Sequence, residues 1–102
     1  MPSSLTEKEF LQHINTAFRV KLDTPEPFEL KLVEVKGYPS KADERSGMER
    51  FSVFFTGQKD LRLPQDTYRL EHPAMGTFDI FIVPIGEDAQ AVRYEAVFNY
   101  FK

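Results

Sequence analysis

The sequence contains no cysteine and no tryptophan. Without cysteine the chain cannot form a disulfide, a thiolate nucleophile or a cysteine-ligated zinc site, so packing must supply its stability. Apolar residues nowhere form the run of about 18 that a membrane-spanning helix needs, and residues 1–7 lack the basic and apolar regions of an export signal. These absences predict a cytoplasmic protein without a membrane partner.

A concentrated positive face is also missing. The chain has 13 basic and 16 acidic residues, for a formal net charge of −3, and its basic residues are scattered through the predicted strands. Proteins that bind nucleic acids neutralise phosphates with clustered lysine and arginine. The sequence therefore predicts no nucleic-acid partner.

Phenylalanine, by contrast, is abundant. Ten Phe and four Tyr stand among 102 residues, and a chain of this length fits one domain, residues 1–102. Aromatic and β-branched side chains pack well on the pleated surface of a sheet. The composition therefore favours a core built from strands.

The stretch at residues 63–84 predicts a β-hairpin. Apolar and polar residues alternate over 68–72 and again over 78–82, and the tetrapeptide P-A-M-G at 73–76 separates them. Proline presets one backbone angle of a turn and glycine supplies a left-handed one. The other strands of the protein can be added to this hairpin.

One helix and six strands are predicted in all. Thr6 and Glu9 form a capping box that begins a helix of two or three turns, with Phe10 toward the core. The predicted strands span residues 18–22, 28–35, 50–56, 68–72, 78–83 and 92–101. This pattern predicts an α+β fold that is mainly antiparallel β: about six strands in a small barrel or sandwich, with the N-terminal helix packed on it.

Two details of the pattern concern irregular backbone. The inward phase of the second strand shifts at Leu32 and Val33, which indicates either a β-bulge or burial on both faces. Residues 37–48 and 84–91 are predicted loops, because turn-forming and charged residues replace the alternation there. The role of the 37–48 loop does not follow from its composition.

Several segments resemble a family of small bacterial single-domain proteins of unknown function. They are F-S-V-F-F-T-G at 51–57, L-P-Q-D-T-Y-R-L-E-H-P at 63–73, Gly76, F-I-V-P-I-G at 81–86 and Y-E-A-V-F-N at 94–99. Asp66 stands where the family pattern has glycine, and Asp tolerates a positive φ. The resemblance covers nearly the whole chain and implies no catalytic residue. It implies an accessory or structural part in bacterial gene neighbourhoods that encode tail-fibre-like, collar-domain proteins.

His72 is the polar candidate for chemistry, and two interpretations of it remain open. It precedes the Pro73 turn, and it could act as a general base of a hydrolase or isomerase with Tyr68 or Glu71 as partner. A turn histidine bonded to a loop carbonyl is favoured, since catalysis also needs an oriented substrate group. His13 and His72 lack metal-ligand spacing, so we expect no catalytic, cofactor-binding or metal-binding residue.

Four apolar residues are out of phase with the main inward face of their strands: Phe54, Phe81, Val97 and Phe101. They lie beneath the helix or form an apolar surface for a partner. We therefore predict a non-enzymatic protein–protein interaction or assembly module of a bacterial, tail-like system. The expected partner is another protein or a second copy that pairs with the C-terminal strand as an edge.

The alternative is a small β-barrel that binds an apolar small molecule. Its interior would be lined by Phe51, Val53, Tyr68, Leu70 and Phe98. Such a site needs a cavity of about 300 Å³ or more, whereas a domain this small normally fills its interior with side chains.

Overall fold

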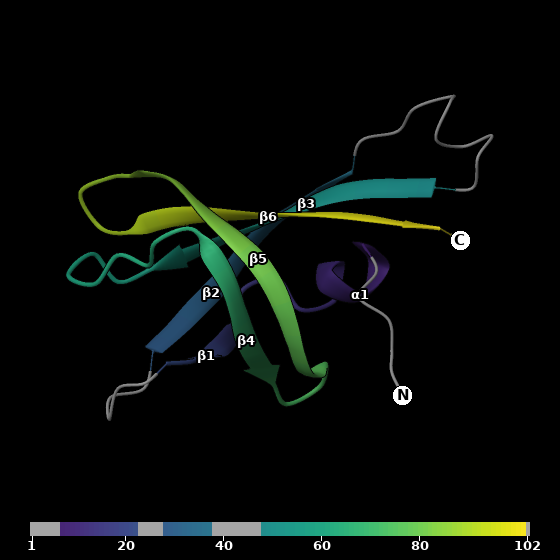
Figure 1. Ribbon diagram of the computed structural model, residues 1–102, viewed down its shortest axis with the longest axis horizontal. Helices are drawn as coiled ribbons and strands as arrows, with labels where there is room; N and C mark the ends of the chain where they lie inside the picture. The colour runs from purple at the N-terminus through teal and green to yellow at the C-terminus, as the bar shows by residue number, and fades with distance from the viewer. Residues whose placement is uncertain (1–6, 23–27, 38–47, 102) are drawn as a thin grey trace.

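A computed structural model of the chain describes residues 7–22, 28–37 and 48–101, with the side chains of residues 7–22, 28–37 and 51–98. Within these residues the chain forms one short helix and six antiparallel strands, which close into a barrel in the order β1-β2-β3-β6-β5-β4 (Figure 1). The elements are α1 (Glu7–Leu11), β1 (Ala17–Lys21), β2 (Phe28–Gly37), β3 (Met48–Gly57), β4 (Asp66–His72), β5 (Gly76–Glu87) and β6 (Val92–Phe101). The predicted fold class is confirmed.

The predicted hairpin is present as β4 and β5. Its ladder runs from Asp66 paired with Ile82 to His72 paired with Gly76. Gly76 has a φ of 84°, in the left-handed region that glycine enters without strain. The local turn chemistry therefore fixes where β4 ends and β5 begins.

The phase shift in β2 is a β-bulge. The register with β3 passes from Leu32 paired with Phe55 to Glu34 paired with Phe54, which leaves Val33 as the extra residue. Beyond it Val35 is half-buried and Glu34 is exposed. The bulge thus keeps apolar side chains on the inner face of a long, strongly twisted strand.

Two sequence-based expectations are wrong in their boundaries. The loop predicted at 84–91 begins later, because β5 continues to Glu87 across a second irregularity between Pro84 and Gly86. A bulge tolerates a proline, which cannot donate to the ladder.

The helix has five residues rather than two or three turns. The amide of His13 bonds to the carbonyl three residues back, and the positive φ of Asn15 turns the chain into β1. Within the loop predicted at 37–48, residues 38–47 lie outside the described part of the chain.

The barrel is split along the β5–β6 seam. The ladder between these strands extends only from Glu87 and Val92 to Val83 and Glu95, and the first half of β5 pairs with β4 instead. β6 runs on to Phe101, and among the described residues its extension pairs with β3 alone. The C-terminal strand, predicted to be an edge, is therefore an edge strand over residues 96–101 and an interior strand before them.

The helix fills this split from the inner side, below the β3–β6 extension in Figure 1. The fully buried ring of Phe10 has its centroid 5.3 Å from that of Phe98, 6.0 Å from Phe51, 6.1 Å from Phe78 and 6.2 Å from Phe18. These five rings come from α1 and four different strands. A helix too short to be stable alone is thereby held on the barrel by one aromatic side chain.

Candidate functional site

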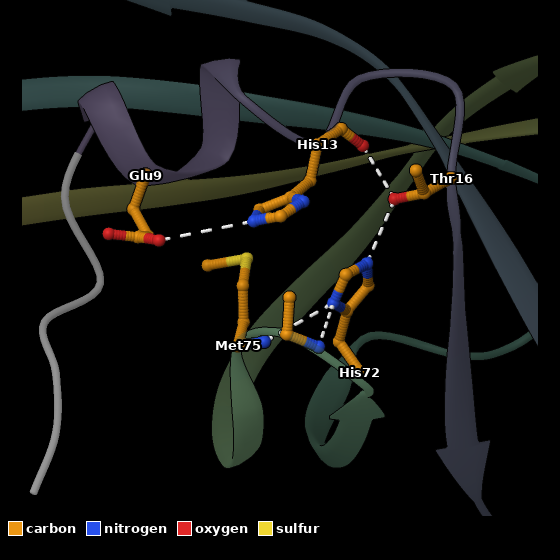
Figure 2. A network of polar contacts seen from close by, with 6 residues as sticks. Glu9, His13, Thr16, His72 and Met75 are labelled. Atoms are coloured by element: carbon orange, nitrogen blue, oxygen red, sulfur yellow. Dashed lines mark hydrogen bonds and ion pairs between the residues drawn. The ribbon is translucent and has the colours of Figure 1, made fainter.

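His72 lies at the end of β4 within a chain of hydrogen bonds (Figure 2). Its Nδ1 accepts the backbone N–H of Ala74 at 3.0 Å and of Met75 at 3.3 Å. Its Nε2 lies 3.0 Å from Thr16 Oγ1, and that hydroxyl donates to the carbonyl oxygen of His13 at 2.6 Å. The network ties the β4–β5 turn to the segment that joins α1 to β1.

The contacts of His72 determine its tautomer. Because Nδ1 accepts two amide protons, the ring proton must be on Nε2, which then donates to Thr16 Oγ1. Burial lowers the pKa of the His72 imidazole below its ordinary value, and the nearby His13 lowers it further. The two rings have centroids 4.7 Å apart, and that of Phe18 lies 4.4 Å from His72. His72 is therefore held neutral.

Glu71 lines the same outer hollow as His72, but the contacts of the two predicted catalytic partners go to other groups. The hydroxyl of Tyr68 donates to the Pro64 carbonyl at 2.6 Å, and the carboxylate of Glu71 lies 3.5 Å from Lys21 Nζ. The basic lone pair of His72 is occupied by the turn amides, so it is not free to accept a substrate proton. His72 is a turn residue as expected, but it accepts backbone N–H groups where a bond to a carbonyl was predicted.

The predicted apolar surface is only partly exposed. Phe81 is 50% exposed and Val97 is 55% exposed, whereas Phe54 is half-buried and the side chain of Phe101 lies outside the described residues. Phe81 and Val97 occupy the next outward-facing positions past Val83 and Glu95, the last pair of the β5–β6 ladder. Two apolar side chains therefore flank the point where the two strands separate.

Arginine, and not the helix, covers Phe54. The guanidinium carbon of Arg93 lies 4.8 Å from the centre of the Phe54 ring, and Arg93 Nη2 donates to Glu34 Oε1 at 2.7 Å. Of the two alternatives predicted for Phe54, the position beneath the helix does not occur, because α1 packs on the opposite face of the sheet through Phe10. The ion pair extends across three strands, and the cation shields the ring from solvent.

The barrel interior is filled. Of the five residues predicted to line a ligand cavity, Phe51, Val53 and Leu70 are fully buried, and Tyr68 and Phe98 pack against the same core. Two hollows of about 520 and 640 Å³ lie instead on the outer surface of β1, and neither contains any of these five residues. Both are lined by Ala17, Arg19 and Glu29. The sequence carries no local signal for these hollows, because each is lined by segments far apart in the chain: β4 meets β1 at the smaller one, and the end of β3 and residues 90–91 meet β1 and β2 at the larger one.

The chain was compared with known protein families, curated proteins and solved structures. A family model described as a domain of unknown function, DUF6916, matches residues 5–98. The chain belongs to this family. No curated protein and no solved structure matches the chain.

Two further findings concern metal-ligand side chains and long apolar helices in the described part of this DUF6916 domain. No group of three or more His, Asp or Glu side chains converges in the part of the chain that the structure describes. One such pair is Glu9 and His13, with Oε2 of the first 3.9 Å from Nε2 of the second (Figure 2). Within the same residues, no helix is long and apolar enough to cross a membrane.

Proposed function

We propose that the protein is a non-enzymatic protein–protein interaction or assembly module, which binds its partner through the outer face of β5 and β6 around Phe81 and Val97. The main observation in its support is that these two apolar side chains are about half exposed at the place where the β5–β6 ladder ends. We further propose the bacterial, tail-like setting that the family resemblance implies.

The surroundings of the two side chains support this proposal. Fully burying a large apolar side chain stabilises a complex by about 1.5 to 3 kcal/mol, so covering the exposed halves of Phe81 and Val97 would contribute about 1 kcal/mol each. Nearby polar side chains already have partners. Ser52 Oγ donates to Glu95 Oε2 at 2.7 Å, and the Arg69 Nε donates to Asp79 Oδ1 at 3.0 Å. A partner can therefore dock without breaking buried polar contacts.

The state of His72 supports a non-enzymatic role. Its Nδ1 has no lone pair left for a substrate, and its Nε2 proton is engaged by Thr16. A general base must reach the proton that it removes with a free lone pair. A structural role in the turn therefore accounts for the contacts of His72, the residue that most resembled a catalytic group.

The proposal is tested by capture of partners from the native host with tagged wild-type protein and a Phe81→Ser, Val97→Ser double variant. Leu61→Ser is the matched control, because Leu61 is an exposed apolar residue outside the surface. Both variants should have the same midpoint denaturant concentration of unfolding as the wild type, since substitutions at exposed sites change stability by about 0.5 kcal/mol or less. We expect specific proteins to be captured by the wild type and the control but not by the double variant. Capture of the same proteins by all three would refute the proposed surface.

A further inference from the structure

We infer that the open edge of β6, residues 96–101, pairs antiparallel with the same edge of a second copy, so that one continuous sheet joins two barrels. This inference rests on the proposed function, since it names a partner for the same surface. Residues 96–101 pair with β3 on one side, and on the other side the β5 ladder has already ended at Glu95. Their outward backbone groups therefore have no strand neighbour within the described chain.

The ends of β2, β3 and β6 form a sheet with two edges, one at β2 and one at β6, and these edges differ in how well they are protected from strand addition. At the β2 edge, the Glu7 carboxylate of α1 lies so close to Gly37 that a Cβ there would meet it at 2.7 Å. That stretch of β2 also carries the charged residues Glu34 and Lys36. Natural proteins blunt sheet edges with charges, prolines, bulges or covering elements. The β2 edge has charges, a covering side chain and the bulge at Val33.

The β6 edge has no charge, proline or bulge. Residues 96–101 read A-V-F-N-Y-F, without a charge, proline or glycine, and the β3–β6 register runs through them without a bulge. Such a segment of aromatic and β-branched residues is a template for strand addition. An identical uncharged edge is a complementary partner, whereas a charged strand would leave its charge against apolar neighbours.

Symmetry restricts the register of such a pair. A two-fold axis between two antiparallel strands maps each face of the sheet onto itself. Each residue therefore pairs with a residue of the partner strand that points to the same face. Pairing centred on Asn99 sets Val97 opposite Phe101 and Phe98 opposite Tyr100, apolar against apolar or aromatic. Centring on Phe98 would set Val97 opposite the amide residue Asn99. Aromatic and β-branched cross-strand pairs stabilise sheets by about 0.2 to 1 kcal/mol each, which favours the Asn99 centre.

Sedimentation velocity of the full chain, from micromolar to millimolar concentration, tests the inference. The wild type should shift from monomer to dimer, and Val97→Lys should raise the dissociation constant about tenfold or more, since the Val97–Phe101 pair occurs twice in the dimer. Leu61→Lys is the control with the same charge change at an exposed apolar site outside the edge. It should dimerise like the wild type. Circular dichroism and denaturant unfolding verify that both variants are folded.

The absence of cysteine permits a second test that does not depend on affinity. With one thiol per chain, Asn99→Cys should be joined to its copy by a short thiol-reactive cross-linker, and Leu61→Cys should not. A wild type that stays monomeric throughout, or equal cross-linking of the two cysteine variants, overturns the inference. If the monomer still captures another protein in a manner that depends on Phe81 and Val97, the proposed function stands while the inference fails.

Discussion

Nδ1 of His72 accepts the backbone N–H of Ala74 at 3.0 Å, so the last side chain of β4 holds the turn that leads into β5. Through Nε2 and Thr16 the same ring reaches the connection between α1 and β1. One imidazole therefore joins two segments that are far apart in the sequence. Its neutral form is required, because a proton on Nδ1 would point at two amide protons.

Stability should fall in mildly acidic solution because of His72. Its pKa is lowered in the folded state, by burial first and by His13 second. The unfolded chain therefore binds this proton more readily, and the free energy of unfolding decreases as pH falls below about 6.5, the ordinary histidine pKa. The stabilisation is fully present above that value. Denaturant unfolding between pH 5 and pH 8 measures the effect.

His72→Asn is the variant that isolates this group. Its side-chain oxygen can still accept the amides of residues 74 and 75, as in an Asx turn, but it does not titrate. We expect the pH dependence between 5 and 8 to become weaker. Asp79 and Asp88 also have lowered pKa values, the first from its bond to Arg69 and the second from backbone amides. They act only as pH falls below about 4, so an unchanged slope above pH 5 in His72→Asn would contradict the assignment.

A buried hydroxyl on β6 should matter more than an exposed one on β4. Tyr94 is fully buried, and its hydroxyl accepts the backbone N–H of Leu63 at 2.9 Å. Tyr94→Phe leaves that buried amide without a partner, which costs about 1 to 3 kcal/mol. Tyr68→Phe, which removes the exposed bond to Pro64, should cost less than about 1 kcal/mol. Equal losses in denaturant unfolding would show that the Leu63 contact is not what stabilises this part of the barrel.

Removal of the Phe10 ring should release the helix from the barrel. Phe10 packs among four other rings and is fully buried, so Phe10→Ala should lower the free energy of unfolding by about 3 to 5 kcal/mol. Leu11→Ala, one residue further on the exposed side, should change it by about 0.5 kcal/mol or less. Amide exchange of residues 7–15 should accelerate in Phe10→Ala only. Retained protection there would mean that other contacts hold α1.

Arg93 should act as a cover for Phe54. Arg93→Gln removes the cation above the ring and the ion pair with Glu34. Stability should change by less than about 1 kcal/mol, since exposed ion pairs contribute little. Binding of a hydrophobic fluorescent dye should nevertheless rise, because the ring is uncovered. Arg69→Gln, which removes the exposed ion pair with Asp79, is the control and should leave dye binding unchanged.

The features that the sequence predicts well are local. The P-A-M-G turn and the phase shift at Leu32 and Val33 each depend on a few neighbouring residues, and both are present in the fold. The helix cap failed as a guide to helix length, because the chain needs to turn at Asn15 to bring Phe18 under Phe10. The helix begins at Glu7 and tertiary contacts decide where it ends, whereas Thr6 of the predicted capping box lies outside the described residues.

The contacts that shape the candidate site are long-range, which is why pattern analysis missed them. Arg93 reaches Glu34 across 59 positions, and Thr16 reaches His72 across 56. Neither pair is marked by spacing or motif. Phase alone placed Phe81, Val97 and Phe54 off the main inward face, but it could not show that the first two are exposed while a neighbouring arginine covers the third. Strand phase gives the face of a residue, and side-chain packing then decides its exposure.

The most direct test of the open edge is amide hydrogen exchange of β6, followed residue by residue in the full chain at low and at high concentration. Successive amides of a strand point to opposite sides, so at low concentration alternate amides among residues 97–101 should exchange fast while their neighbours are protected by β3. Residues 93–95, paired on both sides, should all be protected. At high concentration the fast amides should become protected. Fast exchange that persists unchanged at every concentration, or full protection at the lowest one, would contradict the account.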